Sequence, residues 1–131
     1  MNIALASDHA GRSLRMRLVG HLEDKGFQVL DLGVESEDSV DYPIYARKVC
    51  KAIQGQQAEL GVLVCGSGQG MAIRANKEKG IRAALCTSQE LAKLAKEHND
   101  ANILCLGERM ISADLALSIL DMFKLYYLKK K

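Results

Sequence analysis

The chain has 131 residues, of which 48% are hydrophobic and 26% charged, and this composition excludes collagen-like, disordered and small disulfide-rich proteins. Its length suits a single domain over residues 1–131, which buries roughly two-thirds of its unfolded surface and needs no disulfide or metal to hold its core. The formal net charge of +2 depends on three lysines at the C-terminus, because the remaining residues carry 15 basic against 16 acidic side chains, so the sequence does not indicate a nucleic-acid-binding face.

The first half of the chain alternates short apolar runs with longer amphipathic ones. Asn2–Ala6 predicts a strand, and Arg12–Lys25 predicts a helix because leucines recur there every fourth residue. Gln28–Leu32 predicts a second strand, and the acidic, polar segment Gly33–Asp41 predicts a loop. Pro43 then suits the first turn of a second helix.

The same alternation continues from residue 60 onward. Leu60–Cys65 is fully apolar, which is typical of a parallel strand covered by helices on both faces, and a short helix follows to about residue 76. Arg82–Cys86 predicts a fourth strand. Thr87 and Glu90 then form a capping-box pattern for a helix over Ser88–Glu97.

The last predicted elements are a strand over Ile103–Leu106 and a helix from Ser112 toward Tyr127. Five strands that alternate with helices imply a parallel sheet with helices on both faces, because parallel strands are joined by right-handed crossovers. The sequence therefore predicts an α/β protein with a single αβα domain and a five-stranded parallel sheet.

Several features predict a cytoplasmic protein. The longest apolar runs are far short of the ~20 residues of a membrane span, and the N-terminus has no basic region of a signal peptide. No two cysteines form a CxxC pair, so neither a zinc site nor a redox motif is predicted. Reduced thiols are expected in this compartment. The cysteines are Cys50, Cys65, Cys86 and Cys105.

Ligands of an open parallel sheet bind outside the carboxyl ends of its strands, so the residues that follow each strand are the first candidates for a site. The candidates after the first, third and fifth strands are Ser7, Asp8, His9, Cys65, the segment Gly66–Gly70, Gly107, Glu108 and Arg109. His98 and Asn99 precede the fifth strand and therefore lie at the opposite edge. They reach the site only if the chain curls round or if they come from a second subunit.

The sharpest local feature is the run Gly66, Ser67, Gly68, Gln69, Gly70 between a buried strand and a helix. Backbone N–H groups in such a loop converge on an anion, whereas the alternative is a tight turn with packing glycines. Met71 excludes the dinucleotide-binding fingerprint, which needs glycine at that position, and the Gly-Lys-Ser/Thr of a P-loop is absent.

Cys65 directly precedes this loop, and nearby N–H groups and a helix N-terminus favour a thiolate, which acts as a nucleophile or a general base. Cys86 and Cys105 are expected to be core residues. His9 and His98 adjoin polar clusters and are candidates for acid–base chemistry or phosphate contact, whereas His21 is expected to face solvent.

Six motifs in register resemble one family, ribose 5-phosphate isomerase B, and the wider group that includes the galactose 6-phosphate isomerase subunits. The resemblance runs from the N-terminus to about residue 123. Its motifs are Ser7-Asp8-His9-Ala10-Gly11, Asp41-Tyr42-Pro43, Cys65-Gly66-Ser67-Gly68-Gln69-Gly70-Met71, Gly80-Ile81-Arg82-Ala83-Ala84, His98-Asn99-Asp100-Ala101-Asn102 and Leu106-Gly107-Glu108-Arg109.

The resemblance implies a Rossmann-like or flavodoxin-like fold, no metal and no cofactor, and a homodimer or homotetramer whose sites are shared between subunits. It implies interconversion of ribose 5-phosphate and ribulose 5-phosphate in the pentose phosphate pathway, through a cis-enediolate. The implied catalytic residues are Cys65 as general base, His98 for ring opening, and Asp8 and Ser67 for orienting hydroxyls. The implied substrate contacts are His9 and Arg109 to phosphate, Tyr42 against the sugar, Asn99 on an enediolate oxygen, and the N–H groups of Gly66, Ser67, Gly68, Gln69 and Gly70 as an anion hole.

The C-terminus departs from the resemblance. The family continues past the last helix with arginines that bind phosphate, whereas this chain ends in Lys129-Lys130-Lys131. Lysine supplies a point charge without the bidentate geometry of arginine. Two alternatives therefore stand beside the ribose isomerase: a phosphosugar-binding relative without catalysis, and an isomerase of a six-carbon phosphate such as allose 6-phosphate or galactose 6-phosphate.

Overall fold

A computed structural model describes residues 1–35 and 40–129 of the chain. All neighbouring strands in its sheet are parallel, and the strand order is β2-β1-β3-β5-β4. The predicted five-stranded parallel sheet is confirmed. β5 lies between β3 and β4, so the last two strands exchange places relative to the flavodoxin-like order 2-1-3-4-5. The strands are β1 (Asn2–Ser7), β2 (Gln28–Asp31), β3 (Leu60–Cys65), β4 (Ala83–Leu85) and β5 (Ile103–Gly107).

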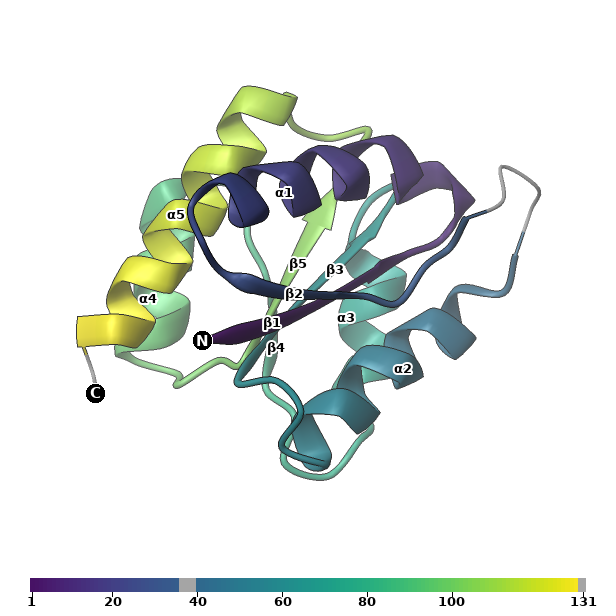
Figure 1. Cartoon of the computed structure of the whole chain (residues 1–131), viewed down its shortest axis with the longest axis horizontal. Helices are drawn as coiled ribbons and strands as arrows, with labels where there is room; N and C mark the ends of the chain where they lie inside the picture. Colours follow the sequence, from purple (N-terminus) through teal and green to yellow (C-terminus); the bar gives the residue numbers. More distant parts are fainter. Residues whose placement is uncertain (36–39, 130–131) are drawn as a thin grey trace.

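Helices cover both faces of the sheet, which confirms the single αβα domain (Figure 1). One face packs against α1, α4 and α5, and the other packs against α2 and α3. The helices are the 3₁₀ turn η1 (His9–Gly11), α1 (Arg12–Asp24), α2 (Tyr42–Gln54), α3 (Gln69–Ala75), α4 (Gln89–Glu97) and α5 (Ala113–Lys129). Residues 36–39 of the predicted loop and the last two lysines lie outside the described residues.

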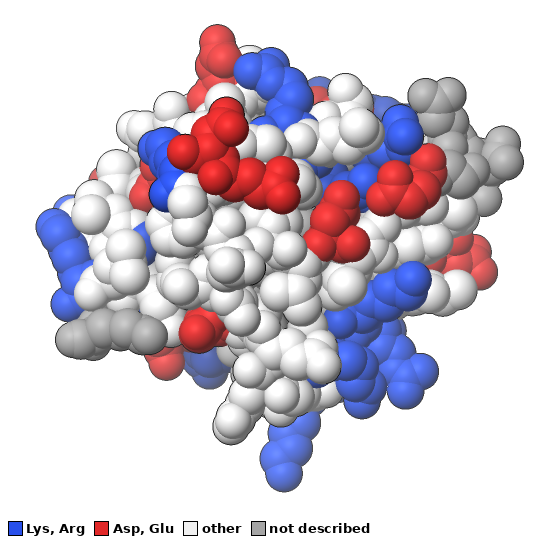
Figure 2. Space-filling view, in the orientation of Figure 1, with Lys and Arg blue, Asp and Glu red and all other residues white. Residues whose placement is uncertain are grey.

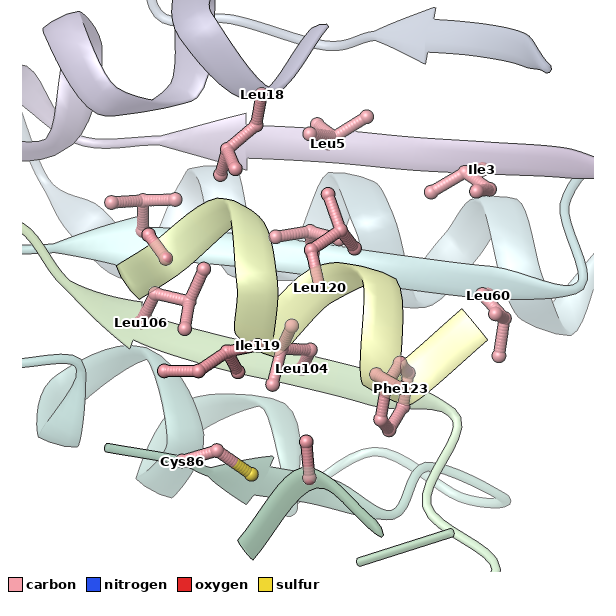
Figure 3. Close-up of a cluster of buried hydrophobic side chains, with 14 of the residues drawn as sticks. Ile3, Leu5, Leu18, Leu60, Cys86, Leu104, Leu106, Ile119, Leu120 and Phe123 are labelled. Atoms are coloured by element: carbon pink, nitrogen blue, oxygen red, sulfur yellow. The ribbon is translucent and has the colours of Figure 1, made fainter. Parts of the chain in front are cut away.

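The face under α1, α4 and α5 carries large aliphatic side chains. Successive residues of a strand point to opposite faces of the sheet, so every second strand residue belongs to this face. Figure 3 shows Ile119, Leu120 and Phe123 of α5 packed against the side chains of the sheet. These three side chains are no more than 1% exposed. This face holds the larger of the two cores.

The face under α2 and α3 carries more small side chains, among them Ala4 and Ala6 on β1 and Cys105 on β5, beside the larger Leu63 and Ile103. At Gly61 on β3, a Cβ would lie 2.4 Å from Cγ1 of Val49, so α2 packs there directly on the strand backbone. The absence of side-chain volume brings α2 and α3 close to the sheet.

Two local predictions at the helix starts have different outcomes. Pro43 lies in the first turn of α2, as expected. The predicted Thr87 cap of α4 is wrong by one residue, because the Oγ of Ser88 accepts the Leu91 N–H at 3.1 Å. Thr87 and Ser88 are both good N-cap residues, and only the path of the chain decides between them.

Acidic and basic side chains are interspersed over the face shown in Figure 2, with basic side chains gathered at the lower right over α2. This helix carries Arg47, Lys48 and Lys51. In the part of the chain that the structure describes, no helix is long and apolar enough to cross a membrane.

Candidate active site

A cavity of about 370 Å³ lies at the carboxyl ends of β1, β3 and β5, where the sequence places its candidates. Segments that follow three strands meet there, because the parallel strands end at the same edge, and the start of α2 adds a fourth segment. The lining residues are Asp8, His9, Ala10, Tyr42, Cys65, Gly66, Ser67, Gly70, Arg109 and Met110.

Cys65 is the last residue of β3, and its side chain is only 6% exposed although it lines the cavity. The backbone N–H of Gly68 donates to its Sγ at 3.2 Å. This contact needs the left-handed backbone of Gly68, at φ 81°, which a residue with a Cβ adopts at a cost. The loop thus aims a backbone donor at the Cys65 sulfur.

The other three cysteines are buried and free, as core residues. Burial raises the pKa of Cys86 to about 11, and burial together with the nearby Glu78 carboxylate raises the pKa of Cys50 to about 11. Burial also raises the pKa of Cys105 well above its usual value. These three groups are neutral thiols near pH 7, so they are poor candidates for a base.

The loop between β3 and α3 is a closely packed turn at the cavity wall. A Cβ on Gly70 would lie 2.9 Å from the Tyr42 ring, and one on Gly66 would lie 3.1 Å from Nη1 of Arg109. Both glycines are therefore packed closely by residues of the cavity wall. The N–H of Gly68 is donated to Cys65, and that of Gln69 is donated to the Ser67 Oγ at 3.2 Å.

Asp8 and His9 follow β1 and line the same cavity as the glycine loop. The Oδ1 of Asp8 accepts the Gly11 N–H at 3.0 Å, which caps η1 and fixes a carboxylate that is 9% exposed. The Val40 N–H donates to Nδ1 of His9 at 3.4 Å. A neutral imidazole that accepts at Nδ1 carries its proton on Nε2, and this N–H is then available to donate to an anion.

His98 and Asn99 lie at the other edge of the sheet. The N–H of Gly61, at the start of β3, donates to the carbonyl of Asn102, whereas Cys65 at the end of β3 pairs with Gly107. Four residues of strand correspond to about 13 Å along the sheet, and His98 lies further back in the chain. Within one chain, the structure therefore does not bring His98 to the cavity.

Asn99 lines a separate cavity of about 330 Å³ at that opposite edge, together with Arg82 and Asn76. The carbonyl of Asn99 accepts Nε of Arg82 at 2.6 Å, and the His98 side chain is 65% exposed. The two residues thus form a polar surface beside the second cavity.

Two residues of the cavity wall have weak signals in the sequence. Ala10 and Met110 line the cavity beside predicted residues, but their side chains have no polar group that would indicate a site in the sequence.

His21, expected to face solvent, instead has its Nε2 2.9 Å from Asp121 Oδ1. Among the described residues there is no group of three or more metal-binding side chains.

Comparison with known proteins identifies the family of this chain. The Ribose/Galactose Isomerase family model matches residues 3–130. The chain belongs to the ribose/galactose isomerase family. As a member of this family it is an isomerase.

Named family members align with nearly the whole chain. Ribose-5-phosphate isomerase B of Escherichia coli is 42% identical over 119 residues, which are 91% of this chain and 80% of that protein. The crystal structure of a ribose 5-phosphate isomerase from Thermotoga maritima has a TM-score of 0.93 at 50% identity, over 94% of this chain and 85% of that one. The Ribose-5-Phosphate Isomerase B structure from Clostridium thermocellum also has a TM-score of 0.93, at 39% identity, over 99% and 98%.

Proposed function

We propose that this family member interconverts D-ribose 5-phosphate and D-ribulose 5-phosphate. The observation that supports this most directly is the position of Cys65, whose sulfur receives the Gly68 N–H at the wall of a cavity that also carries His9 and Arg109. A base, an anion-binding loop and two cationic or proton-donating side chains are the parts that an aldose–ketose isomerisation of a sugar phosphate needs.

In this proposal Cys65 is the general base. Its thiolate removes the proton from C2 of the open-chain sugar, and a cis-enediolate forms. The resulting thiol returns the proton to C1, while the C2 hydroxyl proton passes to the oxygen on C1, so that the carbonyl group ends at C2. Negative charge develops on the carbonyl oxygen, and preorganised N–H groups stabilise it more effectively than water does. The available donors are the amides of Gly66, Ser67 and Gly70 at the cavity wall, because the amides of Gly68 and Gln69 are donated inside the loop.

The remaining residues of the cavity bind and orient the substrate. Nε2 of His9 and the Arg109 guanidinium contact the phosphate, and the Tyr42 ring packs against the sugar. Asp8 and Ser67 orient the hydroxyl groups. The contacts to the phosphate are charge-assisted, and Arg109 is able to make a bidentate one. Together with the contacts to the sugar they fix the substrate with C2 near the sulfur.

We further propose that a second copy of the chain supplies His98 and Asn99. Neither residue can reach the cavity of its own chain, and both lie on an exposed polar surface. His98 of the second copy would transfer a proton to the ring oxygen during ring opening, and Asn99 would bind an enediolate oxygen. A homodimer with twofold symmetry would then form two such shared sites.

The first test is an isomerase assay with ribose 5-phosphate, supported by Cys65→Ala and by Cys50→Ala as a matched control. Removal of the base is expected to lower kcat by at least about a thousandfold, corresponding to about 4 kcal/mol of transition-state stabilisation. Cys50→Ala should retain most of the activity. Full activity in Cys65→Ala would overturn the proposed mechanism.

The shared site has a separate test. Cys65→Ala and His98→Ala are each expected to be inactive alone, but heterodimers formed by mixing them contain one intact site. Random exchange of equal amounts should restore about a quarter of the wild-type activity. No recovery, despite subunit exchange shown by mass spectrometry, would contradict a site shared between copies.

The alternatives are separated by substrate. Allose 6-phosphate and galactose 6-phosphate are assayed beside ribose 5-phosphate, and a higher kcat/KM for either would reassign the substrate. Saturable binding of ribose 5-phosphate without turnover would identify a phosphosugar-binding relative.

A further inference from the structure

Arg15 is a fully buried cation close to the cavity that takes no part in the proposed chemistry. It lies on the first turn of α1, its side chain is 0% exposed, and it is among the largest fully buried side chains of the protein. A buried charge costs several kcal/mol unless it is paired and hydrogen-bonded, so the contacts of this group indicate what it holds in place.

The contacts of Arg15 join the ends of two neighbouring strands. Its Nη1 donates to the carbonyl of Val34 at 2.6 Å and to the Oγ of Ser7 at 3.3 Å. Ser7 is the last residue of β1, and Val34 lies just beyond the end of β2. One guanidinium nitrogen therefore connects the two chain segments at the carboxyl edge of the sheet.

Two carboxylates compensate the charge. Nε of Arg15 lies 3.2 Å from Oδ1 of Asp31, and Nη2 lies 3.6 Å from Oε1 of Glu35. Neither nitrogen has a hydrogen-bond partner in the part of the chain that the structure describes, so these contacts are electrostatic. The strongest directional contact of the group is the one to the backbone of Val34.

These contacts extend the pairing of β1 and β2 as far as the cavity. The Leu32 N–H donates to Leu5 at 2.8 Å and the Ser7 N–H donates to Gly33 at 2.7 Å, both after the regular ladder has ended. Ser7 is followed directly by Asp8 and His9, which line the cavity. The position of those two side chains therefore depends on the end of β1 and on the segment after β2, both of which are hydrogen-bonded to Arg15.

We propose that Arg15 is a positioning residue, which sets the Ser7-Asp8-His9 turn for binding the substrate phosphate and hydroxyl groups. The inference rests on the proposed function and adds a residue outside the cavity to it. Displacement of a substrate-binding turn by about 1 Å weakens binding by roughly tenfold or more. Because His9 and Asp8 bind the ground state, the expected change is in KM and Kd, with kcat changed less.

The test uses the double variant Arg15→Met/Asp31→Asn, which removes the buried charge together with its nearest carboxylate. An apolar replacement of a buried ion pair is often tolerated, so this variant is expected to fold. KM for ribose 5-phosphate and Kd for inorganic phosphate should both rise about tenfold, while kcat stays within about twofold. Arg15→Lys keeps one donor for Val34 and should fall between this variant and the wild type. The matched control is Arg17→Met, since Arg17 is an exposed residue of the same helix and should leave KM unchanged.

A purely structural role predicts a different result, in which the melting temperature falls while KM and Kd stay at their wild-type values. That result would overturn the proposal. If the double variant does not fold, Arg15→Lys decides: a threefold or larger rise in Kd supports the proposal, and no rise overturns it. If the wild type binds phosphate but does not isomerise ribose 5-phosphate, the proposed function fails, and the Kd comparison still decides the role of Arg15. Absence of phosphate binding in the wild type would overturn both.

Discussion

The two faces of the sheet differ in what their side chains do. Under α1, α4 and α5, large side chains such as Leu104 and Phe123 fill the space between sheet and helices. Under α2 and α3, small residues such as Ala4 and Gly61 bring the helices close to the strands. Cys65 points to this second side, and the helix starts that carry Tyr42 and the glycine loop meet above it. The first face contributes most of the buried side-chain volume, and on the second face the helices pack close to the strands.

The same strands contribute to the larger core on one side and to the packing beside the cavity on the other, because their side chains alternate between the two faces. The backbone of β5 is not distorted when a large residue points to one side and a small residue points to the other. Substitutions on the two faces should therefore have separable effects, on stability for the first face and on substrate binding for the second. The following variants test this separation.

The largest effect is expected from Phe123→Ala. Loss of a fully buried aromatic side chain leaves a cavity in the larger core and should lower the free energy of unfolding by about 3–5 kcal/mol. Urea denaturation measures this change. KM for the substrate should stay at the wild-type value below the unfolding transition, and a large change in KM would break the proposed separation of the two faces.

Gly61→Ala should have a smaller effect, and it should change both the stability of the protein and KM for the substrate. The new methyl group would meet Val49 at 2.4 Å, so α2 has to move outward, at a cost of about 1–3 kcal/mol of stability. Because α2 begins with Tyr42, KM should rise as well. The double variant Gly61→Ala/Val49→Ala restores the space, and a failure to recover stability would show that the contact does not limit the packing.

Gly70→Ala should change binding with little change in folding. A Cβ at this position would lie 2.9 Å from the Tyr42 ring, and Tyr42 is 39% exposed, so the new methyl group displaces a ring at the surface and not a core residue. KM is expected to rise about fivefold, which corresponds to about 1 kcal/mol. The matched control is Gly20→Ala on α1, where a Cβ meets nothing within 4 Å and KM should not change.

The smallest effect is expected from Asp121→Asn on the outer surface of the first face. Partial burial raises the pKa of this carboxyl, but hydrogen bonds from His21, Lys25 and Lys124 together outweigh burial, and the pKa lies below its usual value of 3.8. The group therefore stabilises the protein above about pH 4, and this contribution is lost as the pH falls through the folded-state pKa.

At pH 7 the asparagine variant should be less stable by under about 1 kcal/mol, because these ion pairs are partly exposed and screened. The wild type and the variant should converge as the pH falls well below 4. Chemical denaturation at a series of pH values measures the difference. A difference that persists unchanged in acid would show that the carboxylate charge is not its source.

Much of the fold follows from local patterns. The alternation of apolar runs with leucine-rich amphipathic segments predicts all five strands and the helices between them, because periods of 2 and 3.6 are properties of single elements. Pro43 predicts the start of α2 for the same reason. The candidates Asp8, His9, Cys65 and Arg109 follow from one rule, since parallel strands end at a common edge.

Other features depend on contacts between distant segments. No local pattern places β5 between β3 and β4, or selects Ser88 over Thr87 as the cap of α4. Within the glycine loop, the sequence predicts converging N–H groups, but only the folded backbone shows that the one of Gly68 is donated to Cys65.

The class of the fold, the family resemblance and the edge of the sheet where the candidate cavity lies could thus be inferred from the sequence, since each depends on residue type and spacing. Three features needed the folded chain: the different sizes of the two cores, the distance of about a strand length between His98 and Cys65, and the burial of Arg15 near the ends of β1 and β2. Arg15 in sequence is an ordinary polar position of an amphipathic helix. It becomes a buried cation only because the ends of β1 and β2 close over it and supply carbonyl, hydroxyl and carboxylate partners.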